Sequence, residues 1–268
     1  MSRSIQLLST DFDGTLIGHP SDGRCSGRFA NVLMEHKARK GIWTINTGRS
    51  FLHTLEGVEH FQAPVAPDFL VSLEREIYCR DENGSWQAHQ EWNSNCQKQH
   101  HILFESVRPL MAILTDYIRA SPDVTLIEEK HQPVGLVTTS EDVMNRVVSV
   151  ITEHSREYPD FSYQRNTIYL RFCHRAYHKG SALEEIARLT DISPSQILAA
   201  GDNHNDLAML DGKYAHMACC PSNSIEEVKQ VVRDAGGYIA SAKCADGIAE
   251  AYHWFTEHSV EMSEQTPR

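Results

Sequence analysis

Two aspartates one residue apart, Asp11 and Asp13, are the side chains of this sequence best placed to do chemistry. They follow an apolar run, residues 5–10, and Gly14 and Thr15 come directly after them. Residues i and i+2 of an extended segment point to the same side, so both carboxylates can face one ligand. Carboxylates that close repel each other unless a cation lies between them, and hard oxygen ligands suit Mg²⁺. A surface turn is the alternative, because Asp and Gly are common turn residues.

Two further motifs have residue types that bind anions. Thr47 and Gly48 follow the apolar segment 42–46 and offer a hydroxyl and backbone N–H groups, although an ordinary strand-to-helix turn would look the same. Lys179 precedes a predicted helix, whose N-terminus already carries partial positive charge. An anion shared by the lysine and the helix would explain this position, and a solvated loop lysine is the alternative.

A second acidic group follows the apolar segment 197–201. It consists of Asp202, Asn205 and Asp206, which bring two carboxylates and an amide to another strand end. These residues would give the predicted metal site further oxygen ligands. A plain helix start is the other interpretation, because Asp is stabilising near a helix N-terminus.

Short apolar runs alternate with amphipathic stretches near both ends of the chain, which predicts an α/β fold with a Rossmann-like core, a parallel sheet with helices on both faces. The predicted strands are residues 5–10, 42–46, 69–72, 197–201 and 214–218. Open sheets of this kind bind ligands outside the carboxyl ends of their strands, so the polar groups should meet at one edge. Capping boxes predict helix starts at Ser181 and Ser224.

The middle of the chain has a different pattern, with long amphipathic segments and alternating strands. Here Ser140 is a candidate N-cap, and Pro109 should start or kink a helix. We therefore expect a core formed by residues 1–83 and 179–268 and a smaller inserted α+β cap domain at residues 84–178.

Charge and composition argue against some classes of protein. The formal charge of −11 argues against general binding to nucleic acid or to anionic membranes, since both need a basic face. The absence of a long apolar run or a signal peptide predicts a cytoplasmic protein. The seven cysteines are expected to be reduced thiols.

Together the four motifs, in this order and spacing, resemble the haloacid dehalogenase (HAD) superfamily over nearly the whole chain. The segment Pro67–Leu70 and the following Glu76–Tyr78 are similar to the Cof-type, sucrose-phosphatase-like branch, which carries a type IIB cap. One departure is the pair Glu74 and Arg75, where relatives commonly have Gly-Thr. This departure puts the local turn and its substrate contacts in question.

The resemblance implies a Mg²⁺-dependent phosphatase that hydrolyses a phosphate monoester of a small metabolite, most simply a sugar phosphate. Asp11 would be the nucleophile that forms an aspartyl-phosphate, and Asp13 the general acid and base. By the same resemblance, Mg²⁺ is held by Asp11, the carbonyl of Asp13, Asp202 and, through water, Asp206. The phosphoryl oxygens are bound by Thr47, Gly48, Lys179 and Asn205.

Other functions remain open for the same scaffold. A phosphomutase would need a second phosphate site in the cap, for which Arg165, Arg171 and Arg175 are candidates. A non-catalytic binding protein would usually have lost one of the motif residues, and a phosphonate-cleaving relative would need a helical cap near residue 20. Candidate substrate contacts in the cap are Lys130, His131 and Arg165, and the oligomeric state is not predicted.

Overall fold

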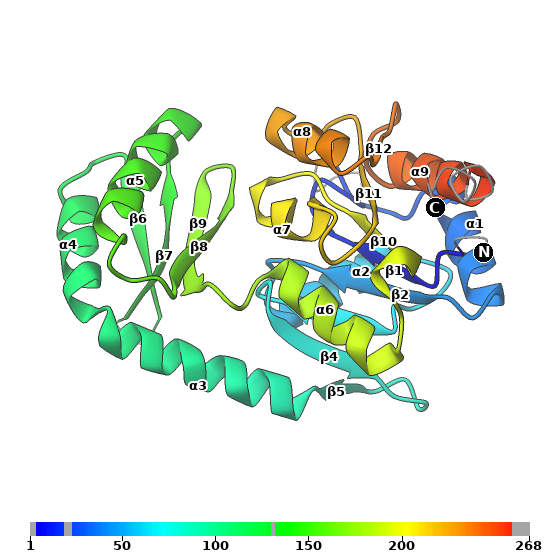
Figure 1. Ribbon diagram of the computed structural model, residues 1–268, viewed down its shortest axis with the longest axis horizontal. Helices are drawn as coiled ribbons and strands as arrows, with labels where there is room; N and C mark the ends of the chain where they lie inside the picture. Colours follow the sequence, from blue (N-terminus) through cyan, green and yellow to red (C-terminus); the bar gives the residue numbers. More distant parts are fainter. Residues whose placement is uncertain (1–3, 19–22, 130–131, 259–268) are drawn as a thin grey trace, which may run out of the picture. The chain divides into compact units, whose positions relative to one another are not determined.

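The computed structural model describes residues 4–18, 23–129 and 132–258. The chain forms two compact units, which are considered separately: a core unit, residues 1–89 and 179–268, and a cap unit, residues 90–178 (Figure 1). The first boundary falls after His89, not after residue 83 as the sequence suggested. The reason is an extra core strand, β5 (Trp86–Ala88), which pairs with its neighbour β4 (Glu76–Arg80).

The core unit is built on an eight-stranded sheet in the order β12-β11-β10-β1-β2-β3-β4-β5. Neighbouring strands from β12 to β3 are parallel, and β4 and β5 add an antiparallel hairpin at the edge. The remaining strands are β1 (Leu7–Thr10), β2 (Ile42–Asn46), β3 (Phe69–Ser72), β10 (Ile197–Ala200), β11 (Met217–Cys220) and β12 (Tyr238–Ile239). The predicted fold class is therefore confirmed, but β11 begins at Met217 and not at Tyr214, because its ladder with β10 starts where Leu198 faces Met217.

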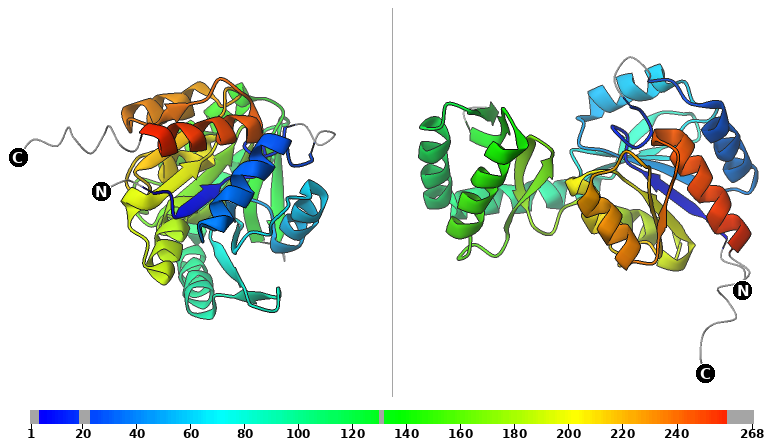
Figure 2. Two further views of the ribbon diagram at one scale, coloured as in Figure 1. Left: turned by 90° about the vertical axis from the view of Figure 1, so that its right-hand side faces the viewer. Right: turned by 90° about the horizontal axis from the view of Figure 1, so that it is seen from above.

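Helices cover both faces of this sheet, as Figure 2 shows from two further directions. On one face lie α1 (Gly27–Ala38), α2 (Phe51–Phe61) and α9 (Cys244–His258), whose apolar side chains share one core with the sheet. The other face carries α6 (Lys179–Thr190), α7 (Leu207–Leu210) and α8 (Glu226–Asp234), packed in that order against one another. The short 3₁₀ turns η2 (Pro194–Gln196) and η3 (His204–Asp206) flank β10.

Two predicted helix caps are wrong. Helix α6 already begins at Lys179, so Ser181 lies within its first turn and does not cap it. Helix α8 begins at Glu226 with Ile225 in the N-cap position, and Ser224 is buried outside the helix. In both cases a tertiary contact, and not the local capping sequence, sets where the helix starts. The Lys179 side chain is bound inside the core, and the Ile225 N–H donates to the carbonyl of Asp202.

The cap unit is an antiparallel sheet covered by helices. Its sheet has the order β6-β7-β9-β8, and the strands are β6 (Val124–Glu129), β7 (Gln132–Thr138), β8 (Phe161–Asn166) and β9 (Tyr169–His174). Helices α3 (Gln90–Ser106), α4 (Arg108–Arg119) and α5 (Glu141–His154) contribute to its apolar core. As predicted, Pro109 lies in the first turn of α4, and the Ser140 side chain caps α5 by accepting from Val143 N–H.

Two features of the whole sequence can also be compared with the structure. All seven cysteines are free thiols. Among the described residues, no helix is both long and apolar enough to cross a membrane.

Candidate functional site

The polar motifs meet because they follow strands that are neighbours in the core sheet. Asp11 comes directly after β1, Thr47 after β2 and Asp202 two residues after β10, and β1 lies between the other two strands. All three strands are parallel, so their carboxyl ends are at the same edge. This edge of the core unit is the candidate active site.

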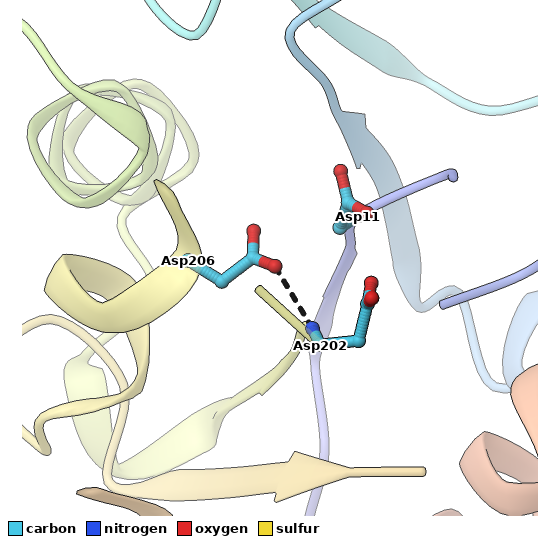
Figure 3. Close-up of side chains that lie close together, drawn as sticks. All are labelled: Asp11, Asp202 and Asp206. Carbon is cyan, nitrogen blue, oxygen red and sulfur yellow. Dashed lines mark hydrogen bonds between the residues drawn. The ribbon is translucent and has the colours of Figure 1, made fainter. Parts of the chain in front are cut away.

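Three buried carboxylates form the centre of the site. Oxygens of Asp11, Asp202 and Asp206 lie within 4.8 Å of one another. Figure 3 shows the three side chains close together; Asp11 directly follows β1, Asp202 lies in the turn after β10 and Asp206 is the last residue of η3. One oxygen of Asp206 accepts hydrogen bonds from the backbone N–H groups of Asp202, at 2.8 Å, and Asn203, at 3.0 Å, which fixes the turn after β10.

Lys179 supplies positive charge within this cluster. Its side chain is fully buried, and its Nζ lies 2.5 Å from Asp11 Oδ1 and 2.7 Å from Asp206 Oδ1. Burial by itself would lower the pKa of Lys179, but the carboxylates of Asp11 and Asp206 outweigh it and raise this pKa above its ordinary value. The backbone is anchored as well, because Asn46 Nδ2 donates to the carbonyl of Lys179.

The three carboxylates carry more negative charge than Lys179 alone can balance. Burial raises the pKa of Asp11 well above its usual value; Lys179 opposes this shift, and Asp206 and Asp202 add to it. Burial also raises the pKa of Asp202 to about 7, with Asp206 adding to the shift. A divalent cation would relieve this repulsion, and three converging carboxylates are the hard oxygen donors that Mg²⁺ takes. The donor set therefore fits a divalent metal.

The turn after the first motif brings backbone and hydroxyl groups against Asp202. Gly14 has a φ of 86°, and a Cβ placed on it would lie 2.2 Å from Asp202 Oδ2, so only glycine fits there. The buried hydroxyl of Thr15 donates to Asp202 Oδ1 at 2.7 Å. Thr15 was not among the predicted site residues, although it belongs to the motif that pointed to the site.

The carboxylate of Asp13 lies apart from the three-carboxylate cluster. Both of its oxygens accept from Arg49, at 2.7 Å from Nε and 2.5 Å from Nη2, and its side chain is 43% exposed. The guanidinium of Arg49 also lies over the Phe12 ring, 4.9 Å from its centroid. Arg49 follows the predicted Thr47-Gly48 pair directly, but its ion pair links two motifs and has no local sequence signal.

Two of the predicted phosphate-binding residues, Gly48 and Asn205, lie against a carboxylate that the sequence did not assign to the site, that of Glu74. Thr47 is 1% exposed, and its hydroxyl accepts from the Arg49 N–H. Asn205 Nδ2 donates to Glu74 Oε1 at 2.8 Å, and Glu74 also lies against Gly48. Glu74 stood out in the sequence only as a departure from related proteins.

The structure describes one of the three candidate substrate contacts in the cap unit. Lys130 and His131 lie outside the described residues. Arg165 is on β8, where its Nη1 donates to Asn145 Oδ1 of α5.

Comparisons with known proteins found relatives in sequence and in fold. A Streptococcus pyogenes protein that carries a provisional phosphatase name is 22% identical over 275 residues, which covers 92% of this chain and 97% of that protein. The crystal structure of the Synechocystis sucrose-phosphatase, in complex with sucrose and phosphate, has a TM-score of 0.70 at 18% identity and covers 94% of this chain and 98% of its own. The HAD subclass IIB sugar phosphatase BT4131 has a TM-score of 0.62 at 16% identity and covers 93% and 98%. At these identities the structural likeness concerns the fold.

The family model for haloacid dehalogenase-like hydrolases matches residues 68–251, more than half of the chain. This match includes the lysine and the acidic motif, and the resemblance seen in the four motifs is thereby confirmed. The chain belongs to the haloacid dehalogenase-like hydrolase family.

Proposed function

We propose that this protein is a Mg²⁺-dependent phosphatase that hydrolyses a phosphate monoester of a small metabolite, with sugar phosphates as the first substrate class to test. One observation carries the proposal: the buried Asp11 carboxylate at the end of β1 is held by Lys179 beside Asp202 and Asp206. The hydrolase family and the sugar-phosphatase names of two structural neighbours support it.

Asp11 is the proposed nucleophile. One of its oxygens is hydrogen-bonded to Lys179, which fixes the direction of the carboxylate. An Asp11 oxygen attacks phosphorus, the bond to the leaving-group oxygen breaks, and an aspartyl-phosphate forms. Water then attacks this phosphorus and returns the Asp11 carboxylate with release of phosphate.

Asp13 is the proposed general acid and base. In the first step it gives a proton to the departing oxygen, and in the second it takes a proton from the attacking water. The two hydrogen bonds from Arg49 hold the Asp13 carboxylate in one orientation. In contrast to Asp11, this carboxylate is partly exposed, so a bound substrate can come within hydrogen-bond reach of it.

The charge of the phosphoryl group would be balanced by residues and by metal. Thr47, the Gly48 N–H, Lys179 and Asn205 are the proposed phosphoryl-binding groups. Mg²⁺ held by Asp11, Asp202 and the carbonyl of Asp13, with support from Asp206, would supply further positive charge to the transferring oxygens.

A phosphomutase receives no comparable support from the cap unit. Strand residues that alternate point to opposite faces of a sheet, and Arg171 faces Gln164 in the β8–β9 ladder while Arg165 faces Leu170. Arg165 and Arg171 therefore lie on opposite faces of the cap sheet. These two side chains therefore do not point to one shared phosphate site, and the third candidate, Arg175, follows the end of β9.

The test is phosphate release from a panel of sugar phosphates, nucleotides and cofactor phosphates. We expect Mg²⁺-dependent hydrolysis of at least one sugar phosphate, loss of activity with EDTA, recovery on adding Mg²⁺, and no activity in Asp11→Asn. The matched control is Asp123→Asn, an exposed aspartate in the cap unit, which should behave as wild type. Equal rates for wild type and Asp11→Asn would refute the mechanism, and activity that survives chelation would refute the metal requirement.

A further inference from the structure

The turn between β3 and β4 holds two non-glycine residues in a strained conformation. Leu73 has a φ of 51° and Glu74 a φ of 65°, the left-handed region that glycine and asparagine normally occupy. The turn is closed by a hydrogen bond from Arg75 N–H to the Ser72 carbonyl. Two consecutive positive φ values are typical of a type I′ hairpin turn, for which Asn-Gly is the favoured sequence. Strain of this kind persists where the surrounding structure holds it, and it concentrates at functional sites.

The strained turn is tied to the loop that carries the second motif. Glu74 N–H donates to the carbonyl of Thr47 at 2.9 Å, and Leu73 N–H donates to the carbonyl of Arg49 at 2.8 Å. Thr47 N–H in turn donates to Val71 of β3. These backbone bonds hold the turn of Leu73 and Glu74 against residues 47–49.

That side chain points into the phosphoryl-binding part of the site. Glu74 is 6% exposed, and its Oε1 accepts from Asn205 Nδ2 at 2.8 Å. The same oxygen would lie 3.2 Å from a Cβ built on Gly48, so it lies against that residue. Burial lowers the pKa of Lys179, whereas the charges of Asp11, Asp206 and Glu74, in that order, raise it. Glu74 thus acts on Gly48, Asn205 and Lys179, three of the four groups proposed to bind the phosphoryl oxygens.

The orientation of Asn205 follows from this contact. Its amide nitrogen donates to Glu74, and its Oδ1 is buried without a hydrogen-bond partner among the described residues. A buried unpaired amide oxygen costs free energy, which the charge-assisted bond to Glu74 helps to offset. The donor that a phosphoryl oxygen would use is therefore already engaged by a carboxylate oxygen of the same chain.

We propose that Glu74 is a built-in competitor for the phosphoryl oxygens, which weakens the binding of inorganic phosphate and so favours release of the product. The inference rests on the proposed function and adds to it a residue that sets anion affinity. A phosphate that binds here must displace the Glu74 oxygen from Asn205 Nδ2. It is also repelled by the nearby negative charge of Glu74. A unit charge about 4 Å away at an effective dielectric of about 20 changes the affinity for a monovalent anion by up to roughly 1000-fold, and solvent screening reduces this, so about tenfold is the lower bound expected here.

The test is calorimetric titration of inorganic phosphate into the Mg²⁺-loaded protein. Glu74→Gln removes the charge and keeps the shape, and Glu74→Gly in addition suits the positive φ. Both variants should bind phosphate at least about tenfold more tightly than wild type.

Two matched controls separate charge at this position from other effects. Leu73→Gly relaxes the same turn and keeps the Glu74 carboxylate, and Glu76→Gln neutralises a second carboxylate of the same hairpin, one that accepts from the Tyr78 hydroxyl. Both controls should keep the wild-type affinity for phosphate. Unchanged or weaker phosphate binding in Glu74→Gln would overturn the inference, as would equal tightening in Glu76→Gln.

A parallel assay of phosphate release separates this inference from the proposed function. If wild type hydrolyses phosphate esters and Glu74→Gln binds phosphate no more tightly, the role of Glu74 is refuted while the phosphatase proposal stands. If no protein hydrolyses an ester and Glu74→Gln binds phosphate tightly, the anion site is supported and the phosphatase proposal fails.

Discussion

Replacing Thr15 by valine tests whether the motif threonine tunes the metal site. The Thr15 side chain is buried, and its hydroxyl donates to Asp202 Oδ1 at 2.7 Å. Valine has nearly the same shape and no hydroxyl, so the substitution removes one hydrogen bond to a carboxylate and little packing. A hydrogen bond to a charged group contributes about 1.5–3 kcal/mol. Loss of a partner of a metal ligand typically costs about 10- to 100-fold in metal affinity, which is the same range of free energy.

The protonation of Asp202 adds a pH signature to this prediction. Burial raises the pKa of Asp202 to about 7, and the Thr15 hydrogen bond opposes that shift. Without the hydroxyl the pKa of Asp202 rises further, so near neutral pH Mg²⁺ has to displace more bound proton from the valine variant. The loss of Mg²⁺ affinity should therefore be larger at about pH 7 than at about pH 8.5.

The assay is the Mg²⁺ dependence of phosphate release, paired with calorimetric titration of Mg²⁺ at both pH values. Thr15→Ser keeps the hydroxyl and is the matched control, which we expect to retain most of the metal affinity. Circular dichroism establishes that each variant is folded. A valine variant with wild-type Mg²⁺ affinity, or a serine variant that is equally impaired, would refute the reasoning.

The other predictions concern the same site. Gly14→Ala should lose at least about 100-fold in activity, because its Cβ would lie 2.2 Å from Asp202 Oδ2, and its unfolding free energy should fall by about 1–3 kcal/mol in denaturant titrations. The folded-state pKa values of Asp11 and Asp202 are raised, so the stability that these groups give to the metal-free protein is present at acid pH and is lost as pH rises, for Asp202 as pH approaches about 7. Mg²⁺ should accordingly raise the melting temperature more at about pH 8 than at about pH 5.5, and equal shifts would contradict this assignment. Arg49→Lys cannot make the paired contact to Asp13 and should lower kcat by about tenfold or more, with little change in KM, in steady-state kinetics.

The sequence was enough to predict which strand ends meet. Apolar runs that end in polar residues placed Asp11, Thr47 and Asp202 at one edge of the sheet, because parallel strands share the edge at which they end. Asp206 comes to the same edge in the motif of Asp202, whereas the assignment of Lys179 to this site depended on the resemblance to the haloacid dehalogenase superfamily. The strand-end predictions depend on periodicity and residue type, which are local properties of the chain.

Contacts between motifs could not be predicted in the same way. The Arg49 pair with Asp13 and the Glu74 bond to Asn205 join residues from different strand ends, and no spacing rule relates them. The start of α6 was misplaced for a similar reason, since the buried side chain of Lys179 outweighs the capping signal at Ser181. A helix cap contributes about 1 kcal/mol to stability. This is less than the stability lost when one partner of a buried ion pair is removed.

The position of β1 in the sheet has a consequence for how the protein is made. Leu7 of β1 is paired with Ile197 of β10 on one side and with Ile42 of β2 on the other. On the ribosome, β1 emerges long before β10 exists, and residues 90–178, which form their own compact unit, are synthesised in between. Until Lys179 and Asp202 have been translated, one edge of β1 is unpaired and Asp11 lacks both of these neighbours. A nascent chain that stops within the cap unit has the proposed nucleophile but not the other site residues, so this sheet order couples assembly of the proposed active site to completion of the core.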